Sequence, residues 1–371
     1  MRIDLTVSTV LPDSYRSNRV RSLFNVSPEQ AASHEVSVDI PHEEKPWRIG
    51  AIIGPSGSGK TTVGRAILGE AAYLNGYEWP IDRPIVDAMG EDAEFDDVTG
   101  ALSSVGLGTI PSWLRPHHVL SGGEKFRADL ARALLDTTGD IVIDEFTSVV
   151  DRQVAQVGAH AFGKAWRRKP TGRVVVVSCH YDITDWLQPD WLLDTRDWSF
   201  HWRSLQPRPR ITLDIHQTNW SQWPLFEKHH YLKLSRMIAA KNYVATVDGS
   251  LVGHLAVSTI AGLKAARMAR IVVMPEWQGA GVGMRFIETI AEMWLAGENP
   301  YNRPMTTLIT TGHPGLIGAI RRSPRWVCTS QQMGGTGGKG NLARGAKHGS
   351  MMGLHGGHCR AVAGFRFVGD R

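Results

Sequence analysis

The sequence predicts an α/β protein with two domains, and three observations support this prediction. The chain has 371 residues, of which 42% are apolar, enough for two separate hydrophobic cores. Twice an apolar strand leads through a glycine-rich loop into a helical pattern, at residues 48–68 and at residues 269–296. Between them the Pro-Arg repetition at residues 196–210 is typical of a linker. We therefore expect one domain at residues 1–206 and a second at residues 207–371.

The first strand-to-helix segment contains a phosphate-binding loop. The apolar run RIGAIIG is followed by PSGSGKTT and a helical pattern, the context that the motif G-x-x-x-x-G-K-[ST] requires. Glycines let backbone N–H groups face a phosphate, Lys60 reaches the terminal phosphates, and the Thr61 hydroxyl ligates Mg²⁺. The residues expected to contact ATP here are Gly54, Pro55, Ser56, Gly57, Ser58, Gly59, Lys60, Thr61 and Thr62.

Three further motifs follow the phosphate loop. They are LSGGEKFRADLARALL at residues 120–135, DIVIDEFTSVVD at 140–151 and VVVVSCHYD at 174–182. In this order the motifs closely resemble the ATP-binding cassette (ABC) family of P-loop ATPases. The resemblance implies a signature that caps the γ-phosphate of ATP, formed by Ser121, Gly122 and Gly123.

The same resemblance implies the roles of four other residues. Asp144 would join Thr61 in holding Mg²⁺, and Glu145 would polarise the attacking water. Asp151 matches the D-loop, and His180 matches the switch histidine. These roles suit phosphoryl transfer, which needs charge neutralisation and an in-line water rather than covalent help from the protein.

The ABC resemblance also has consequences for partners. The signature of one subunit completes the ATP site of another in this family, so we expect an ATP-dependent head-to-tail homodimer. Between Lys60 and Ser121 there is no glutamine where the Q-loop of transporters would lie, so coupling to membrane domains is not expected. Phe24 is the best candidate for stacking on adenine, and a core position is the alternative.

The second domain begins with a predicted hairpin. Residues 241–260 form two apolar runs joined at Asp248-Gly249, a strong turn signal. The strand RIVVMP then leads into QGAGVG at residues 278–283 and an amphipathic helix. Small residues at a helix N-terminus make a second phosphate cradle, here without a lysine, and a plain tight turn is the alternative.

Residues 269–296 resemble the coenzyme-binding segment of GNAT-type acetyltransferases. The resemblance implies a GNAT-like acyltransferase fold and acetyl-CoA, or a related acyl-CoA, as the cofactor. The expected contacts to the coenzyme are Val272, Val273, Gln278, Gly279, Ala280, Gly281, Val282 and Gly283. The whole chain resembles a phage and prokaryotic family of ABC-type ATPases fused to predicted acetyltransferases, and its second half resembles the Mom-type acyltransferases that modify adenine in DNA.

Acyl transfer to an amine needs groups that move protons near the coenzyme. The cluster of His229, His230 and Tyr231 offers them, and we take His230 and Tyr231 as the catalytic candidates, with a buried helix start as the alternative. Arg270 and His313 are further candidates beside the coenzyme. A basic and aromatic group either grips nucleic acid or is a helix end with a core tryptophan: Arg321, Arg322, Arg325 and Trp326.

Charge and composition limit the kinds of partner and the compartment that we expect for this protein. Residues 211–371 hold 18 Lys and Arg against 8 Asp and Glu, whereas residues 1–210 hold 23 against 28. Such a basic domain favours a polyanionic partner, nucleic acid or a phosphorylated coenzyme. Only three cysteines occur and no apolar run approaches the roughly 20 residues of a membrane span, so we expect a cytoplasmic protein. Residues 333–359 are predicted to form a flexible glycine-rich loop, whose His355, His358 and Cys359 only weakly suggest metal.

Three hypotheses follow from the sequence. The leading one is an ATP-controlled acyltransferase that modifies a nucleic-acid base. A second keeps the acetyltransferase but gives it a protein or small-molecule amine, and binding of nucleic acid without salt dependence would favour it. A third is an ATP-dependent nucleic-acid-binding module whose GNAT domain is inactive, which a failure to bind acetyl-CoA would favour.

Overall fold

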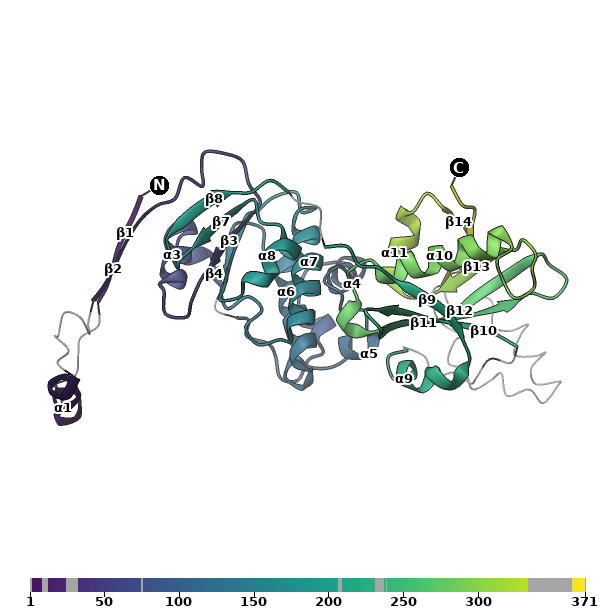
Figure 1. Ribbon diagram of the computed structural model, residues 1–371, viewed down its shortest axis with the longest axis horizontal. Helices are drawn as coiled ribbons and strands as arrows, with labels where there is room; N and C mark the ends of the chain where they lie inside the picture. The colour runs from purple at the N-terminus through teal and green to yellow at the C-terminus, as the bar shows by residue number, and fades with distance from the viewer. Residues whose placement is uncertain are drawn as a thin grey trace. The chain divides into compact units, whose positions relative to one another are not determined.

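The computed structural model describes residues 2–8, 13–24, 33–74, 76–205, 209–230, 237, 239–332 and 362–370. The chain forms two compact units, and Figure 1 labels many of their helices and strands. The first unit comprises Met1–Tyr77, Thr137–Val149 and Trp166–Arg208. The second comprises Glu78–Asp136, Val150–Ala165 and Pro209–Arg371.

The first unit is built on a six-stranded sheet of order β4-β5-β6-β3-β7-β8. Its strands are β3 Ile49–Ile53, β4 Tyr73–Leu74, β5 Ile141–Ile143, β6 Val174–Ser178, β7 Trp191–Asp194 and β8 Ser199–Trp202. All neighbours are parallel except β7 and β8. Every residue of β3 and β6 is buried, as expected for apolar strands in the middle of a parallel sheet.

Helix α3 (Lys60–Leu68) packs closely on this sheet. A Cβ at Gly64 would lie 3.1 Å from side-chain carbons of both Val142 and Val177, so glycine allows the helix to approach β5 and β6. The predicted strand, glycine loop and helix are confirmed. The unit also contains β1 (Arg2–Ser8), β2 (Ser33–Asp39), α1 (Tyr15–Phe24), the 3-10 turn η4 (Tyr181–Ile183) and α8 (Thr184–Leu187).

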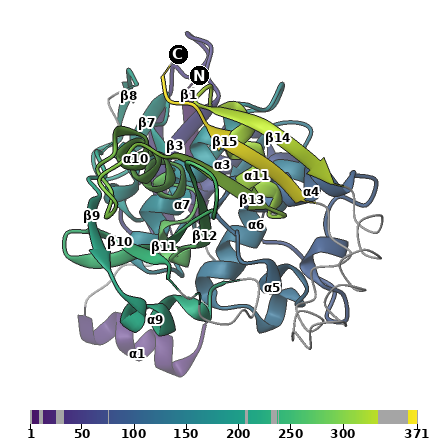
Figure 2. The same cartoon turned by 90° about the vertical axis from the view of Figure 1, so that its right-hand side faces the viewer.

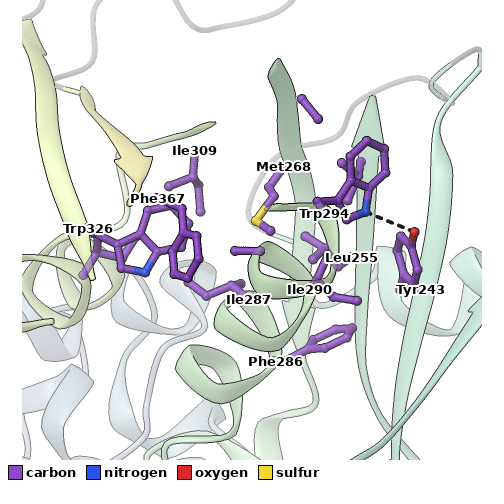
Figure 3. Close-up of a cluster of buried hydrophobic side chains, with 14 of the residues drawn as sticks. Tyr243, Leu255, Met268, Phe286, Ile287, Ile290, Trp294, Ile309, Trp326 and Phe367 are labelled. Carbon is purple, nitrogen blue, oxygen red and sulfur yellow. Dashed lines mark hydrogen bonds between the residues drawn. The ribbon is translucent and has the colours of Figure 1, made fainter. Parts of the chain in front are cut away.

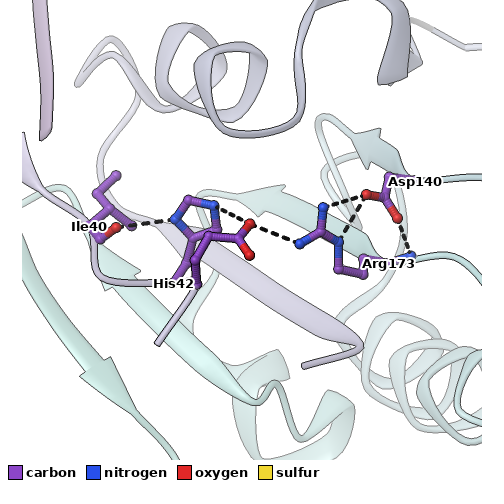
Figure 4. Close-up of polar contacts among 5 residues, drawn as sticks. Ile40, His42, Asp140 and Arg173 are labelled. Atoms are coloured by element: carbon purple, nitrogen blue, oxygen red, sulfur yellow. Dashed lines mark hydrogen bonds and ion pairs between the residues drawn. The ribbon is translucent and has the colours of Figure 1, made fainter. Parts of the chain in front are cut away.

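A chain of polar contacts joins the segment before β3 to the sheet (Figure 4). The buried ring of His42 contacts the Ile40 carbonyl at 3.1 Å and Glu43 at 3.2 Å. Glu43 accepts a hydrogen bond from Arg173, whose guanidinium also pairs with Asp140 at 2.6 Å. These contacts tie residues ahead of β3 to the starts of β5 and β6, and so fix the end of the sheet opposite the phosphate loop.

Four helices that belong wholly or mostly to the second unit come from the first half of the chain. They are α4 (Phe95–Ser104), α5 (Ile110–Trp113), α6 (Gly122–Asp136) and α7 (Arg152–Trp166). α6 buries an apolar stripe that includes Phe126, Leu130 and Leu134, spaced by four residues. Phe126 also lies where a Cβ at Gly158 of α7 would be, 2.6 Å away, so these two helices are in close contact.

The second unit also contains a seven-stranded sheet of order β14-β15-β13-β12-β11-β10-β9. Its strands are β9 Asp214–Thr218, β10 Lys241–Val247, β11 Ser250–Thr259, β12 Ala265–Val273, β13 Thr306–Thr311, β14 Trp326–Gln332 and β15 Val362–Phe367. Only β12 and β13 are parallel, and Figure 2 shows β13, β15 and β14 side by side. The predicted hairpin is confirmed as β10 and β11, with positive φ at Asp248 and Gly249.

Two aromatic-rich cores cover the faces of this sheet. On one face α10 (Val282–Ala296) places Phe286, Ile290 and Trp294 against β10–β13, and Trp294 Nε1 donates to the Tyr243 hydroxyl (Figure 3). On the other face the 3-10 turn η5 (Trp220–Gln222) and α9 (Trp223–Glu227) supply Trp220, Trp223 and Phe226. Helix α11 (Pro314–Arg322) follows β13.

Strands β12 and β13 pair only over part of their length. Their register ends at Met268 opposite Ile309, while β12 continues to Val273. Beyond that point β12 contains a bulge, because Ala269 and Val272 lie opposite Ala256 and His254. Arg270, inside the bulge, has φ +54°. The end of β12 nearest the glycine loop is therefore unpaired on its β13 side.

The compact units do not follow the predicted domain boundary. Residues 78–136 and 150–165, which belong to the predicted 1–206 domain, pack with the second sheet. A domain boundary at residue 206 stays a prediction, and the compact units divide the chain differently. The predicted linker at residues 196–210 begins too early, since it contains strand β8. Residues 333–359 lie outside the described residues.

Candidate active sites

The phosphate loop between β3 and α3 has the backbone that a phosphate cradle needs. Gly54, Gly57 and Gly59 have φ of +149°, +78° and +85°. A Cβ at Gly54 would lie 2.1 Å from Thr195 Oγ1, whereas one at Gly57 would meet nothing within 4 Å. The Lys60 ammonium donates to the Pro55 carbonyl at 2.6 Å, across the loop. The loop is therefore packed at its start and open in its middle, where a phosphate would lie.

Oxygen ligands suitable for Mg²⁺ meet beside the loop. Thr61 Oγ1 donates to Asp144 Oδ2 at 2.7 Å, and the Tyr73 hydroxyl donates to the same oxygen at 2.7 Å. Burial and the bond to Asp144 raise the pKa of Tyr73. Hydroxyl and carboxylate oxygens at this spacing fit the preference of Mg²⁺ for hard ligands. Tyr73 had no recognisable sequence signal because it follows the loop without a motif of its own.

Glu145 and His180 lie in the same unit as this pair. Asp144 Oδ1 accepts a hydrogen bond from the Glu145 N–H at 2.7 Å, and Glu145 has φ +50°. Ser148 donates to the Glu145 carboxylate at 2.5 Å, which orients it. The His180 ring lies 3.5 Å from Thr147 Oγ1. Glu145 thus follows Asp144 with a backbone in the left-handed region, which a non-glycine residue rarely adopts.

The predicted signature lies at the start of α6, in the second unit. Glu124 Oε2 accepts from the Ser121 N–H at 2.9 Å and Ser121 Oγ accepts from the Glu124 N–H at 3.4 Å, forming a capping box. Burial opposes ionisation of Glu124, but hydrogen bonds from Ser112 and Ser121 outweigh it and lower its pKa. Asp151 caps α7 by accepting from the Gln153 N–H at 2.9 Å. Both residues thus start helices.

The glycine loop after β12 forms the second phosphate cradle. Gly279 and Gly281 have φ of +92° and +84°, and Gly281 is the N-cap of α10. A Cβ at Gly281 would meet nothing within 4 Å. The side chains of Val272 and Val282 are buried in the two cores, so only their backbones are available to a coenzyme. An open helix N-terminus with left-handed glycines fits a pyrophosphate.

Two side chains lie just after the ends of β12 and β13, where these strands are no longer paired and diverge, and hydrogen bonds fix both side chains. Gln278 Nε2 donates to the Val273 carbonyl at 2.9 Å. His313 lies at the predicted strand-to-helix junction, where its Nδ1 accepts from the Leu316 N–H and its Nε2–H donates to the Gly108 carbonyl at 2.8 Å. Burial lowers the pKa of His313 despite these bonds. The ring is therefore a neutral, immobilised donor.

His254, which the sequence did not single out, lies at the bulge of β12. Its Nδ1–H donates to the Arg270 carbonyl at 3.4 Å, and its ring contacts those of Trp220, Trp223 and Phe226. Among the described residues Nε2 has no hydrogen-bond partner. Burial lowers the pKa of His254 to about 4. A buried neutral imidazole whose Nε2 lone pair has no partner can accept a proton from a bound substrate.

His230 lies beside this cluster. Its ring is 5.7 Å from that of Trp223, and its charge acts on His254. His229 and His230 form a turn after the end of α9, in which their N–H groups donate to the carbonyls of Phe226 and Glu227. Burial and Lys228 lower the pKa of His229. Tyr231 lies outside the described residues.

A cavity of about 610 Å³ lies at the edge of the same face. Trp220 and three amide side chains, Gln217, Asn219 and Asn242, contribute to its lining. Asn242 is buried, and its Oδ1 has no partner among the described residues. The lining therefore combines amide groups with the edge of a mostly buried indole ring.

The pKa of His254 predicts a pH dependence of stability. The unfolded ring has a pKa of 6.5 and the folded ring about 4, so only the unfolded chain takes up this proton between those values. The contribution of neutral His254 to the free energy of unfolding is therefore fully present above pH 6.5 and is lost as the pH falls toward 4. We expect His254→Gln to remove about 2 kcal/mol of the stability difference between pH 7.5 and pH 5, measured by urea denaturation. His201→Gln, at an exposed site, should leave that difference unchanged.

The remaining candidates divide between surface and core. Trp326 is buried against Phe367, and Arg325 pairs with Glu288, Glu292 and Asp370, so these two stabilise the core of the sheet and do not stack a base. Arg321 and Arg322 are exposed at the end of α11. Phe24 is 72% exposed on α1, not in a core, and its role stays a prediction. His355, His358 and Cys359 lie outside the described residues.

Two features are absent from the described residues. None of the helices there has the length and apolar character to cross a membrane. In the same parts of the chain, no three or more His, Cys, Asp or Glu side chains gather as a metal-binding group.

Comparisons with known proteins match parts of the chain. The sequence model of the Acetyltransferase (GNAT) family matches residues 183–299. The zinc import ATP-binding protein ZnuC of Pseudomonas syringae pv. syringae (strain B728a) is 33% identical over 133 residues, which cover 30% of this chain and 50% of ZnuC. The chain thus spans half the length of this curated relative.

Two solved structures are similar to parts of the fold. The ribosomal-protein-S18-alanine N-acetyltransferase from Escherichia coli has a TM-score of 0.31 and 11% identity, over 43% of this chain and 96% of that one. The dimeric structure of MJ0796, a bacterial ABC transporter cassette, has a TM-score of 0.34 and 17% identity, over 43% and 84%. The sequence matches show that the chain joins an ABC-type ATPase segment to a GNAT acetyltransferase domain.

Proposed function

We propose that this protein is an ATP-hydrolysing ABC-type ATPase fused to an acyl-CoA-dependent acyltransferase that modifies a nucleic-acid base. The observation that carries the proposal is the presence of two phosphate cradles of different chemistry in one chain. The loop before α3 ends in Lys60 and adjoins the Thr61–Asp144 pair, as phosphoryl transfer requires. The loop before α10 is open and has no lysine, as expected for a pyrophosphate that is only held.

The ATP half uses five side chains from the first unit. Lys60 neutralises the terminal phosphates, and Thr61 and Asp144 would hold Mg²⁺, which would supply further positive charge against the phosphate oxygens. Glu145, oriented by Ser148, accepts a proton from the attacking water. His180 lies 3.5 Å from Thr147 and would contact the γ-phosphate. Ser121, Gly122, Gly123 and Asp151 of a second copy would complete each ATP site, giving a head-to-tail homodimer.

The acyl half transfers an acyl group to an amine. The amine nitrogen attacks the thioester carbonyl and loses a proton, the C–S bond breaks, and the thiolate takes up a proton. The coenzyme supplies the activated acyl carbon when bound. His230 and Tyr231 are the proposed proton-transfer groups, and His254 Nε2, which has no partner among the described residues, is a further acceptor nearby.

A nucleobase is the acceptor that the chain favours. Residues 211–371 carry 18 Lys and Arg against 8 Asp and Glu, and Arg321 and Arg322 are exposed. The amide-lined cavity beside Trp220 offers a place for a base. The chain's resemblance to Mom-type enzymes points the same way, by analogy. We place the protein in the cytoplasm, where ATP, acyl-CoA and nucleic acid are all available.

Nucleoside mass spectrometry on digested DNA and RNA tests this function. Cells expressing the wild type should contain an acylated nucleoside that is absent from cells expressing Lys60→Ala or Gly281→Glu. A product that persists in Lys60→Ala would contradict control by ATP. No new mass in either pool would contradict nucleic-acid modification and favour a protein or small-molecule amine, and failure of the purified protein to bind acetyl-CoA would favour an inactive GNAT domain.

A further inference from the structure

The coenzyme loop is held from one side by Arg127 of α6. The guanidinium donates to the Gln278 carbonyl at 2.9 Å, to the Gly106 carbonyl at 2.8 Å and to the Glu276 carbonyl at 3.3 Å. Arg127 is only 3% exposed, and burial lowers its pKa to about 10, which still leaves it charged at neutral pH. A buried cation satisfied by carbonyls fixes the backbone that it contacts, because moving away would leave the charge without partners.

Gly108 connects the ends of both diverging strands. Its N–H donates to Gln278 Oε1 at 2.9 Å, and its carbonyl accepts from His313 Nε2 at 2.8 Å. Gln278 follows β12 and His313 follows β13, so one glycine spans the gap between the two strands. A Cβ at Gly108 would lie 2.8 Å from Gln278 Oε1, and one at Gly106 would lie 2.1 Å from the Gln278 carbonyl oxygen. The segment Gly106–Gly108 therefore packs too closely on Gln278 for either glycine to carry a side chain without displacing it.

Helix α7 touches the same loop. A Cβ at Gly279 would lie 2.9 Å from the Ala161 Cβ and 3.1 Å from the Gly106 Cα. Thus α6 reaches the loop with Arg127 and α7 reaches it with Ala161. Both helices begin at residues with a proposed nucleotide contact, Ser121 for α6 and Asp151 for α7. At 1.5 Å per residue, Arg127 lies about 9 Å and Ala161 about 15 Å along the helices from those residues.

We propose that ATP sets the affinity of the GNAT domain for acyl-CoA through these two helices, with Arg127 as the positioning residue. The proposal rests on the proposed function. Nucleotide held at the N-termini of α6 and α7 shifts both helices, and the close packing passes the shift to Gln278 and Gly279. Gly108 carries it to His313, so that the spacing of β12 and β13 changes with it. Because coupling is reciprocal, acyl-CoA must change ATP affinity by the same factor.

Calorimetric titration of the full-length protein tests this coupling. In the Glu145→Gln background, we expect saturating ATP with Mg²⁺ to change the acetyl-CoA dissociation constant by at least about fivefold. Saturating acetyl-CoA should change the ATP dissociation constant by an equal factor. Arg127→Met should bind both ligands with the ATP dependence reduced to less than twofold, and Arg127→Lys should restore part of it. Arg132→Met, on the same helix but paired with Asp136, should keep the full dependence.

Other outcomes separate this inference from the proposed function. Acetyl-CoA binding that is unchanged by ATP would overturn the coupling and leave the acyltransferase intact. No acetyl-CoA binding at all would overturn both. Equal coupling in Arg127→Met and the wild type would overturn the role of Arg127. If Arg127→Met does not fold, Gly108→Ala tests the same coupling at another contact, because its methyl group would displace the Gln278 side chain. Full ATP dependence in Gly108→Ala would overturn the path through Gly108.

Discussion

Glu145→Gln should bind ATP with nearly unchanged affinity, hydrolyse it about 10²–10⁴-fold more slowly, and accumulate as a dimer. The amide keeps the size and hydrogen bonding of the carboxylate but cannot accept a proton from the attacking water, and proton transfer of this kind contributes about that factor. Lys60, Thr61 and Asp144 are untouched, so binding remains. Phosphate release measures hydrolysis, and light scattering in saturating ATP measures the dimer.

The structure supplies a matched control for this substitution. Glu44 is exposed in the same unit, and Glu44→Gln makes the same chemical change away from the phosphate loop. It should hydrolyse ATP at the wild-type rate. A Glu145→Gln protein that stays monomeric with ATP bound would contradict the sandwiched dimer, and one that hydrolyses ATP normally would assign the water to another residue.

Loops and turns that depend on a few neighbouring residues were predictable from the sequence. The loop from Gly54 to Lys60, the hairpin at Asp248-Gly249 and the glycine turn before α10 each combine a required φ with a local pattern. The wider fold class followed because strands and helices alternate around these loops. Such patterns can be recognised without knowledge of the rest of the chain, because the backbone geometry that they specify involves only a few residues.

Features that depend on distant packing were not predictable. Arg127 belongs to an ordinary amphipathic helix in the sequence, and only the folded unit places Gln278 at its guanidinium, 151 positions along the chain. His254 occurs in an apolar strand, where nothing marks the bulge opposite it. Trp326 and Arg325 illustrate the converse, because their basic and aromatic pattern suggested nucleic acid and their burial and ion pairs explain it instead. Tertiary contacts decide these cases, not local pattern.

Gly281→Glu should lower the affinity for acetyl-CoA by about 100-fold or more while leaving ATP hydrolysis unchanged. The new side chain would enter the open space in front of the α10 N-terminus, where its carboxylate would repel a pyrophosphate and compete for the N–H groups. Losing one or two charge-assisted hydrogen bonds, each worth about 1.5–3 kcal/mol, accounts for a change of this size. Calorimetric titration with acetyl-CoA gives the dissociation constant directly.

Gly262→Glu separates the effect of the site from the effect of the substitution. Gly262 has φ +76° and open space around it, as Gly281 has with φ +84°, so both variants carry the same backbone strain and the same added charge. Only Gly281 adjoins the proposed coenzyme cradle. We expect Gly262→Glu to bind acetyl-CoA normally. Equal losses in the two variants would mean that strain rather than position is responsible, and unchanged binding in Gly281→Glu would show that the pyrophosphate lies elsewhere, which would leave the loop as a strand-to-helix turn.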